Sequence, residues 1–174
     1  AVTLAGQALM QAPGDIVITE EYTYSGTISA YKGIGLTMLG VAMDEQGMRM
    51  DALADTLQKL QRSDQKVRFI YTLTTYQNPT GTCMPLSRKK QLLEIADRYQ
   101  LPIVEDNCYG DVHFDGAKVP SLYALDDSER QIYIGPLSKR FAHGVRLGFV
   151  LARKPHFHNV VSLRFDAGRN YFSA

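Results

Sequence analysis

Short apolar runs alternate with segments of helical pattern along the chain, and this alternation restricts the fold more than any other feature. The runs predict strands over residues 16–19, 36–42, 67–73, 101–104, 132–134 and 147–152. Strands that alternate with helices form a mostly parallel sheet whose faces are covered by helices. The sequence therefore predicts an α/β fold, a three-layer α/β/α sandwich.

The segments between these runs are expected to be helices and turns. Residues 2–11, 25–31 and 50–62 are predicted to be helical, and residues 44–47 to form a turn. Ser87 is expected to cap a further helix, whose apolar face carries Leu92, Ile95, Ala96 and Tyr99. No internal repeat, low-complexity segment or linker interrupts the pattern. We therefore expect residues 1–174 to form a single domain.

The charge and cysteine content exclude several classes of protein. The formal net charge is +1 and the charged residues are scattered, which argues against nucleic-acid binding through this domain. No apolar run reaches the roughly 18 residues that a membrane span requires. Cys83 and Cys108 form no CxxC pair, which is typical of a cytoplasmic setting. His156 and His158 lack further ligands nearby, so we expect no metal site.

The two ends of the chain are unusual for a complete protein. The sequence opens on Ala1, inside a segment that already has a helical pattern. It closes on residues 170–174 without a stopping signal. We therefore expect the chain to be an internal piece of a longer polypeptide.

Polar residues follow three successive predicted strands, where an open α/β sheet binds its ligands. The first strand end is followed by Asn78, in a Gln-Asn-Pro-Thr-Gly turn, and the next by Asp106 and Tyr109. The third is followed by Ser138 and Lys139, and an arginine lies seven residues beyond that lysine. Each feature also has an ordinary structural interpretation. Asn-Pro-Thr-Gly is a good turn, an aspartate often caps a helix, and a Lys-Arg pair is often a solvated surface feature.

Taken together, these side chains match the requirements of pyridoxal phosphate. A lysine amine such as that of Lys139 can form a Schiff base with an aldehyde cofactor. The pyridine nitrogen of that cofactor needs an anion, which Asp106 provides, so that the ring acts as an electron sink. The remaining groups would serve the phenolic oxygen, the phosphate and the ring face, and they are Asn78, Tyr109, Ser138, Arg146 and Tyr24.

Three motifs resemble those of the class I/II aminotransferases of fold type I. They are the run at residues 76–81, the run at residues 104–109, and Ser138-Lys139 followed by residues 144–148. The similarity is greatest to the branch that includes aminoadipate and kynurenine aminotransferases. The 28-residue step from Asn78 to Asp106 agrees with that family, and so does Tyr109 three residues after Asp106.

The resemblance implies a role for each of these residues. Lys139 would bind the cofactor and shuttle the proton, with Asp106 on the pyridine nitrogen. Asn78 and Tyr109 would bind the phenolic oxygen. The phosphate would meet Arg146 and Ser138, and the ring would stack on Tyr24. The reaction would transfer an amino group between an amino acid and a 2-oxo acid.

The resemblance also implies how the chain fits into a longer protein. Residues 1–174 would be the central part of the large, cofactor-binding domain, with the N-terminal segment and the C-terminal small domain lying outside it. The isolated piece would then be inactive, and the complete protein would be a homodimer with its site at a two-fold interface. The final strand, over residues 147–152, would run antiparallel to its neighbour.

Three positions depart from the family pattern. Pro136 stands where relatives usually carry a serine or threonine that binds phosphate, and proline can donate no hydrogen bond there. His143 replaces a usual proline between the lysine and the arginine. Tyr22 replaces the proline before the stacking aromatic. Phosphate binding is therefore expected to differ from that of relatives.

Two other interpretations remain open at this point. The same fold serves as the effector-sensing domain of GntR/MocR-type transcription regulators, where Lys139 would still bind the cofactor. Asn78 favours the enzyme, whereas Pro136 favours the regulator. A phosphoacceptor receiver domain would use Asp106 and Lys139 as its acid and lysine, but the chain is too long for such a domain.

Overall fold

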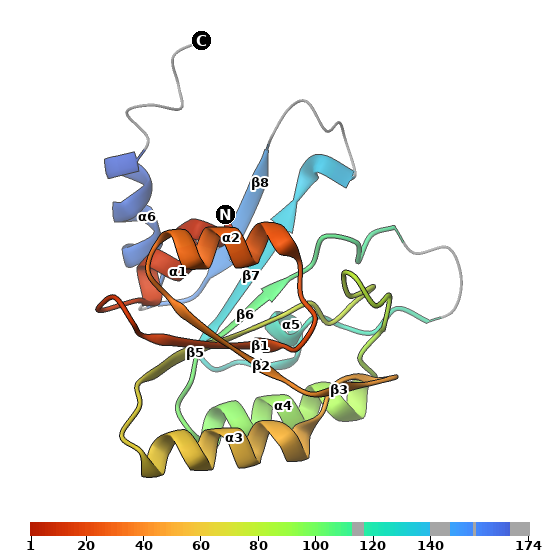
Figure 1. Cartoon of the computed structure of the whole chain (residues 1–174). Coiled ribbons are helices and arrows are strands. Elements are labelled where there is room, and N and C mark those ends of the chain that lie inside the picture. The colour runs from red at the N-terminus through yellow and green to blue at the C-terminus, as the bar shows by residue number, and fades with distance from the viewer. Residues whose placement is uncertain (113–116, 140–146, 155, 168–174) are drawn as a thin grey trace.

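The computed structural model describes residues 1–112, 117–139, 147–154 and 156–167. Its main feature is a six-stranded sheet, which lies between two layers of helices in Figure 1. The strand order is β2 (Thr37–Val41), β1 (Ile16–Glu20), β5 (Val67–Thr72), β6 (Ile103–Asp106), β7 (Gln131–Pro136) and β8 (Gly148–Ala152). The first five run parallel, and β8 pairs antiparallel with β7. The predicted mostly parallel sheet and antiparallel last strand are confirmed.

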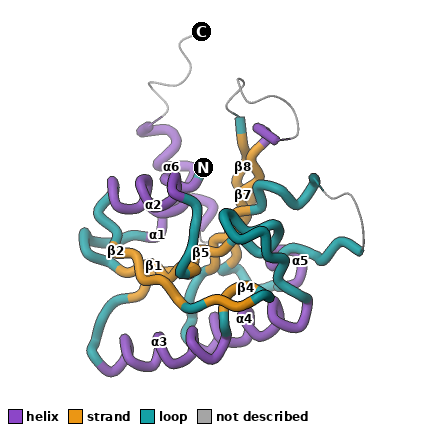
Figure 2. Tube along the Cα trace, turned by 45° about the vertical axis from the view of Figure 1, so that its right-hand side comes forward, coloured by secondary structure: helices purple, strands orange, loops and turns teal. Residues whose placement is uncertain are grey.

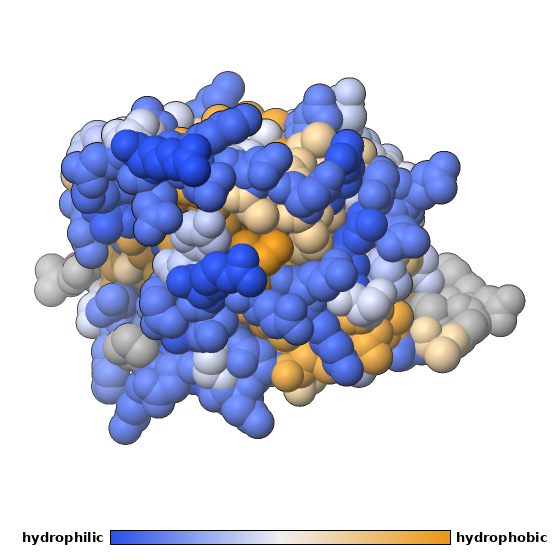
Figure 3. Space-filling view, turned by 90° about the horizontal axis from the view of Figure 1, so that it is seen from below, coloured by the Kyte–Doolittle hydropathy of each residue, from blue (hydrophilic) through white to orange (hydrophobic). Residues whose placement is uncertain are grey.

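Helices cover both faces of the sheet and complete the predicted three layers (Figures 1 and 2). One face is covered by α1 (Val2–Leu9), α2 (Ser25–Gly33) and α6 (His156–Ala167), with α6 packed against α1. The other is covered by α3 (Met50–Arg62), α4 (Leu86–Arg98) and the short α5 (Leu122–Leu125). The outer surface of this second layer is mostly hydrophilic, with apolar side chains between the polar ones (Figure 3).

The central strands bury side chains on both of their faces. Along β5, Phe69 and Tyr71 pack beneath α1 and α2, whereas Ile70 packs against α3 and α4. On β6, Ile103 packs on the side of α3 and α4 and Val104 on the side of α1 and α2. Strands buried on both faces are apolar almost throughout, because no position along them meets solvent. The core is therefore two layers of side chains separated by the sheet.

Several boundaries and elements differ from the sequence predictions. The first helix ends at Leu9 because the next amides turn toward the carboxylate of Asp15, which accepts from the nitrogens of Gln11 and Ala12 at 2.8 and 2.9 Å. The predicted turn at residues 44–47 is part of a small hairpin of β3 (Met43–Asp44) and β4 (Gly47–Met48). Neither these short strands nor α5 and α6 were predicted.

The predicted cap at Ser87 is wrong. The helix begins at Leu86, and its cap position is Pro85 in an extended conformation, two residues before the predicted one. Ser87 consequently lies inside the first turn, where its hydroxyl cannot occupy the capping position that precedes the free amides. The predicted apolar face is present, since Leu92, Ile95 and Ala96 are buried.

A buried ion pair joins α4 to the centre of the sheet. The side chains of Lys89 and Glu105 are 0% and 1% exposed, and the amine lies 3.7 Å from the carboxylate. Lys89 also donates to the carbonyl oxygen of Pro120 at 2.8 Å, and the second Glu105 oxygen accepts from the Leu122 nitrogen at 2.8 Å. Glu105 therefore ties β6 to α4 and to the segment that leads into α5.

Within the described ranges, no helix combines the length and apolar character that a membrane crossing needs.

Replacing Lys89 with methionine should destabilise the protein strongly. The change leaves the Glu105 carboxylate buried without its cation, and removing one partner of a buried pair typically costs about 3–5 kcal/mol. Denaturant unfolding of the full-length protein measures this loss. Lys90→Met is the matched control, because Lys90 is the next residue of the same helix and is exposed. Equal stability of the two variants would contradict the role given to Lys89.

Candidate active site

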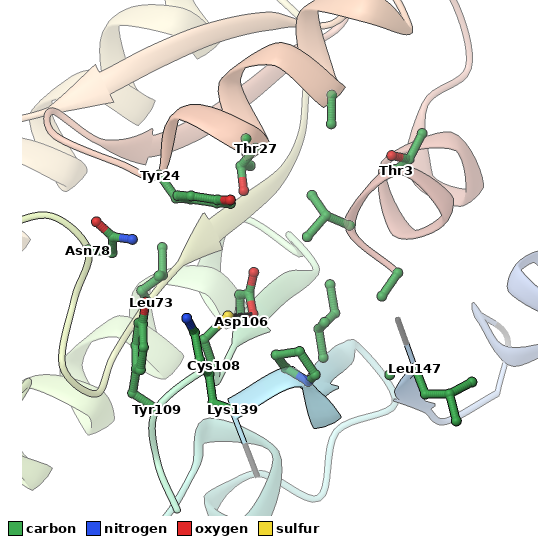
Figure 4. A pocket seen from close by; sticks show the side chains of 17 residues that line it. Thr3, Tyr24, Thr27, Leu73, Asn78, Asp106, Cys108, Tyr109, Lys139 and Leu147 are labelled. Carbon is green, nitrogen blue, oxygen red and sulfur yellow. Dashed lines mark hydrogen bonds between the residues drawn. The ribbon is translucent and has the colours of Figure 1, made fainter. Parts of the chain in front are cut away.

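A cavity of about 710 Å³ lies at the carboxyl ends of the central strands (Figure 4). Its walls include Asp106 at the end of β6, Ile134 and Pro136 on β7, Leu73 just after β5, and Thr27 on α2. Parallel strands bring their carboxyl ends to one edge of the sheet, which is the usual ligand site of open α/β folds. The volume lies within the range of pockets that bind small molecules and cofactors.

Five of the residues singled out in the sequence lie around this cavity, and they are Tyr24, Asn78, Asp106, Tyr109 and Lys139. The structure thus brings together side chains separated by more than one hundred positions in the chain. Ser138 lies in a short 3-10 turn, Leu137–Lys139, and Arg146 and His143 lie outside the described residues.

Lys139 reaches the cavity because the 3-10 turn directly follows β7. The turn is fastened to the next strand by the nitrogen of Leu137, which donates to the Leu147 carbonyl oxygen at 3.0 Å. The Lys139 amine lies 5.7 Å from the centre of the Tyr109 ring, within cation–π range. In Figure 4 this amine points toward the centre of the cavity.

Asp106 is the buried acid of the site, with only 3% of its surface exposed. One carboxylate oxygen accepts from the Tyr71 hydroxyl at 2.9 Å, and the other accepts from the Cys108 thiol at 3.1 Å. Burial raises the pKa of Asp106 above its ordinary value, while these two hydrogen bonds act in the opposite direction. The carboxylate therefore has a donor on each oxygen and still lines the cavity.

Gln77 links two walls of the cavity. Its side chain is 2% exposed, and its oxygen accepts from the nitrogen and hydroxyl of Thr80 at 2.9 and 2.7 Å. Its amide nitrogen donates to the carbonyl oxygen of Tyr22. The turn that carries Asn78 is thereby joined to the segment that leads into Tyr24. Within this turn the Asn78–Pro79 peptide is cis.

The residues that support the site from behind were not among the predicted site residues. Tyr71 lies within the strand predicted over residues 67–73, Gln77 within the Gln-Asn-Pro-Thr-Gly turn, and Cys108 is one of the two cysteines. One available signal was Tyr71 itself, because a tyrosine in a buried central strand needs a partner for its hydroxyl. That partner, Asp106, is 35 residues away in sequence.

Glu20 is a second buried carboxyl group near the site, at the carboxyl end of β1. One of its oxygens accepts from the Leu73 nitrogen at 3.0 Å and from the Thr72 hydroxyl. The other finds no partner among the described residues. The pKa of Glu20 is raised to about 7. Burial is the main cause and the charge of Asp106 acts in the same direction, while the hydrogen bonds act in the opposite direction.

The stability contributed by Glu20 should depend on pH. Its folded-state pKa of about 7 lies above the ordinary value of 4.5, so the folded protein holds this proton more tightly than the unfolded chain. Stability from this group is therefore present at low pH and is lost as the pH rises toward about 7. The shift corresponds to a loss on the order of 3 kcal/mol.

Comparing the full-length protein with its Glu20→Gln variant between pH 5 and pH 8 measures this effect. The stability of the native protein relative to the variant should fall across that range. Glu21→Gln is the control, because Glu21 is the next residue and is exposed. A difference between native protein and Glu20→Gln that does not change with pH would refute the assignment.

No group of three or more histidine, cysteine, aspartate or glutamate side chains is placed to hold a metal ion in the part of the chain that the structure describes.

The chain belongs to the class I and II aminotransferase family, whose sequence profile matches residues 1–174. Aromatic-amino-acid aminotransferase 1 of Thermococcus litoralis is 40% identical over 157 residues, which cover 90% of this chain and 37% of that protein. The mitochondrial kynurenine/alpha-aminoadipate aminotransferase of Bos taurus is 33% identical over 155 residues, covering 86% and 36%. The structure of an archaeal alanine:glyoxylate aminotransferase superposes with a TM-score of 0.91 at 39% identity, covering 95% and 41%.

The family resemblance drawn from the motifs is therefore confirmed. The chain spans well under half the length of these relatives. A more distant relative is the HTH-type transcriptional regulator YisV of Bacillus subtilis, 26% identical over 151 residues, which cover 87% of this chain and 30% of the regulator.

Proposed function

We propose that the full-length protein is a pyridoxal-phosphate-dependent aminotransferase that moves an amino group between an amino acid and a 2-oxo acid. The observation that carries the proposal is the shared cavity of Lys139 and Asp106, an amine and a buried carboxylate at the ends of neighbouring strands. Membership of the class I and II aminotransferase family supports it.

The residues around the cavity fit this cofactor chemically. When bound, pyridoxal phosphate supplies an aldehyde for covalent attachment and a ring that accepts electrons. Lys139 would provide the amine, and Asp106 the anion for the pyridine nitrogen. Asn78 and Tyr109 would supply hydrogen bonds to the phenolic oxygen, and Tyr24 an aromatic face. The cavity of about 710 Å³ has room for such a molecule.

Phosphate binding would rest on fewer side chains of this chain than in relatives that carry a serine or threonine at the position of Pro136. Pro136 lines the cavity but offers no donor, so the phosphate would depend on Ser138, Arg146 and parts of the longer protein. Consistent with that, we propose that residues 1–174 are the central part of the large domain. The N-terminal segment and the C-terminal small domain of the relatives would complete the site.

The chemistry assigned to the protein side chains is proton transfer and charge placement. The Lys139 amine, when not covalently attached, would take up and return the proton that moves during amino transfer, as a general base and acid. Asp106 would keep a negative charge at the bottom of the cavity. Tyr109, whose ring lies under the Lys139 amine, would keep that amine directed into the cavity.

Lys139→Ala should abolish covalent cofactor attachment and almost all transamination. Borohydride reduction of the native full-length protein with pyridoxal phosphate, followed by peptide mass mapping, should place the cofactor on Lys139. Lys154→Ala is the control, because Lys154 is an exposed lysine of the same region and should keep both labelling and activity. Labelling of another lysine in the native protein would overturn the proposal.

The full-length protein should be a homodimer with its sites at a two-fold interface. Exposed apolar side chains at the rim of the cavity support this, since Tyr24 and Leu147 are 46% and 55% exposed in the single chain. Light scattering should give twice the mass of one full-length chain. A mass equal to a single chain would contradict the assembly.

A regulator is the second candidate, favoured by the similarity to YisV over 87% of this chain. In that case the domain would sense an effector through Lys139 within a GntR/MocR-type protein. The two functions differ in the full-length gene, where a regulator would carry a winged-helix domain upstream. Labelling of Lys139 without turnover of any amino acid would favour the regulator.

We also propose a cytoplasmic setting and no nucleic-acid contact through this domain. Cys83 and Cys108 are both free thiols, as is usual in a reducing compartment. The formal net charge of +1 lacks the strong basic excess that is typical of domains that bind a phosphate backbone.

A further inference from the structure

Three buried side chains form a hydrogen-bonded chain that ends at the acid of the site. The hydroxyls of Thr27 on α2 and Tyr71 on β5 are 2.9 Å apart, and the Tyr71 hydroxyl lies 2.9 Å from a carboxylate oxygen of Asp106 on β6. The three residues are 1%, 0% and 3% exposed. The chain therefore links the helix layer to the sheet through side chains that are almost entirely buried.

The direction of this chain follows from a count of hydrogens. A tyrosine hydroxyl has a single hydrogen, and in this geometry Tyr71 donates it to Asp106. The bond between Tyr71 and Thr27 must then be donated by the Thr27 hydroxyl. Because the Cys108 thiol donates to the other oxygen, both oxygens of Asp106 act as acceptors, which is the arrangement that suits the ionised carboxylate. A protonated Asp106 that donated to Tyr71 would reverse both bonds.

The second oxygen of Asp106 has its own donor. The Cys108 thiol donates to it at 3.1 Å. Burial and the charge of Asp106 raise the pKa of this thiol, so the thiol stays protonated and remains a donor. The ionised carboxylate is thus held by two donors that approach different oxygens from β5 and from the segment after β6.

We propose that Tyr71, supported by Thr27 and complemented by Cys108, is the positioning residue that keeps Asp106 ionised and directed into the cavity. The inference rests on the proposed function, because the partner of that charge would be the pyridine nitrogen. A carboxyl group buried this deeply without donors would favour its neutral form, and a neutral acid cannot hold a proton on that nitrogen.

One of the titratable groups near Asp106, Tyr31, provides a control variant for Tyr71→Phe. The titratable groups that feel the charge of Asp106 are Glu20, Tyr31, Tyr71, Cys108, Tyr133 and the Ala1 amine, and Tyr24, Tyr109 and Lys139 share its cavity. The Tyr31 ring packs edge-on against Tyr71, with centroids 5.5 Å apart. The buried Tyr31 hydroxyl finds no hydrogen-bond partner among the described residues. Tyr31→Phe therefore removes a neighbouring hydroxyl that does not bond Asp106.

The first test measures the pKa of Asp106 in the full-length protein without cofactor. Isotope-edited infrared spectra across pH follow its carboxyl band, which Asp106→Asn identifies by its loss. Tyr71→Phe should raise this pKa by about one to two units, since a hydrogen bond to a charged group is lost. Tyr31→Phe should leave it unchanged. An unchanged pKa in Tyr71→Phe, or an equal rise in both variants, would overturn the inference.

Two further variants keep the test decisive if Tyr71→Phe does not fold. Thr27→Val removes the hydroxyl that supports Tyr71 and should raise the pKa of Asp106 by a smaller amount. Cys108→Ala should raise the pKa through the other oxygen, and Cys108→Ser should restore it because serine is again a donor. Native-like pKa values in both Thr27→Val and Cys108→Ala would refute the positioning role.

The second test uses the protein reconstituted with pyridoxal phosphate labelled with ¹⁵N in its ring. The nitrogen signal of Tyr71→Phe should move toward that of the unprotonated ring, whereas Tyr31→Phe should resemble the native protein. A pKa shift in the cofactor-free protein together with no pyridoxal phosphate binding would refute the proposed function but uphold the role of Tyr71 toward Asp106. A native nitrogen signal in Tyr71→Phe, with cofactor bound, would overturn the inference.

Discussion

The placement of β6 between β5 and β7 is the constraint on which the rest of the molecule depends. Its last two residues, Glu105 and Asp106, are adjacent carboxylates that point to opposite faces because side chains alternate along a strand. Glu105 meets Lys89 in the layer of α3 and α4, where it holds helices to the sheet. Asp106 meets Tyr71 and the cavity on the other face. Shifting the register by one residue would exchange the structural acid and the acid of the site.

The parts of the fold that follow from local pattern could be predicted from the sequence. The strand at residues 67–73 is an apolar run bounded by polar segments, and the structure places β5 there. The hairpin of β3 and β4 could not be found in this way, because strands of two residues carry no periodicity. The predicted cap at Ser87 was wrong because a serine near a helix start looks like a cap in the sequence, whereas the cap position is Pro85, two residues earlier.

The residues of the site also divide into those that could be predicted from local sequence and those that depend on distant partners. Lys139, Asp106 and Asn78 could be found because they follow predicted strands, and strand ends meet at one edge of a parallel sheet. Tyr71 and Gln77 could not, because their importance lies in partners far away in sequence, Asp106 and the backbone of Tyr22. The side chains expected to touch a ligand were therefore easier to predict than those that orient them.

The hydrogen bonds of Gln77 couple two walls of the cavity, the turn with Asn78 and the segment before Tyr24, so that they move together. Its side chain holds the Asn78 turn at one end and the backbone before Tyr24 at the other, and it is buried, so solvent does not compete for these bonds. Displacing the turn would carry the Tyr24 segment with it. The two walls should therefore move together, whereas the turn that carries Lys139 on the opposite wall is tied to the next strand separately, by the hydrogen bond from the Leu137 nitrogen to the Leu147 carbonyl oxygen.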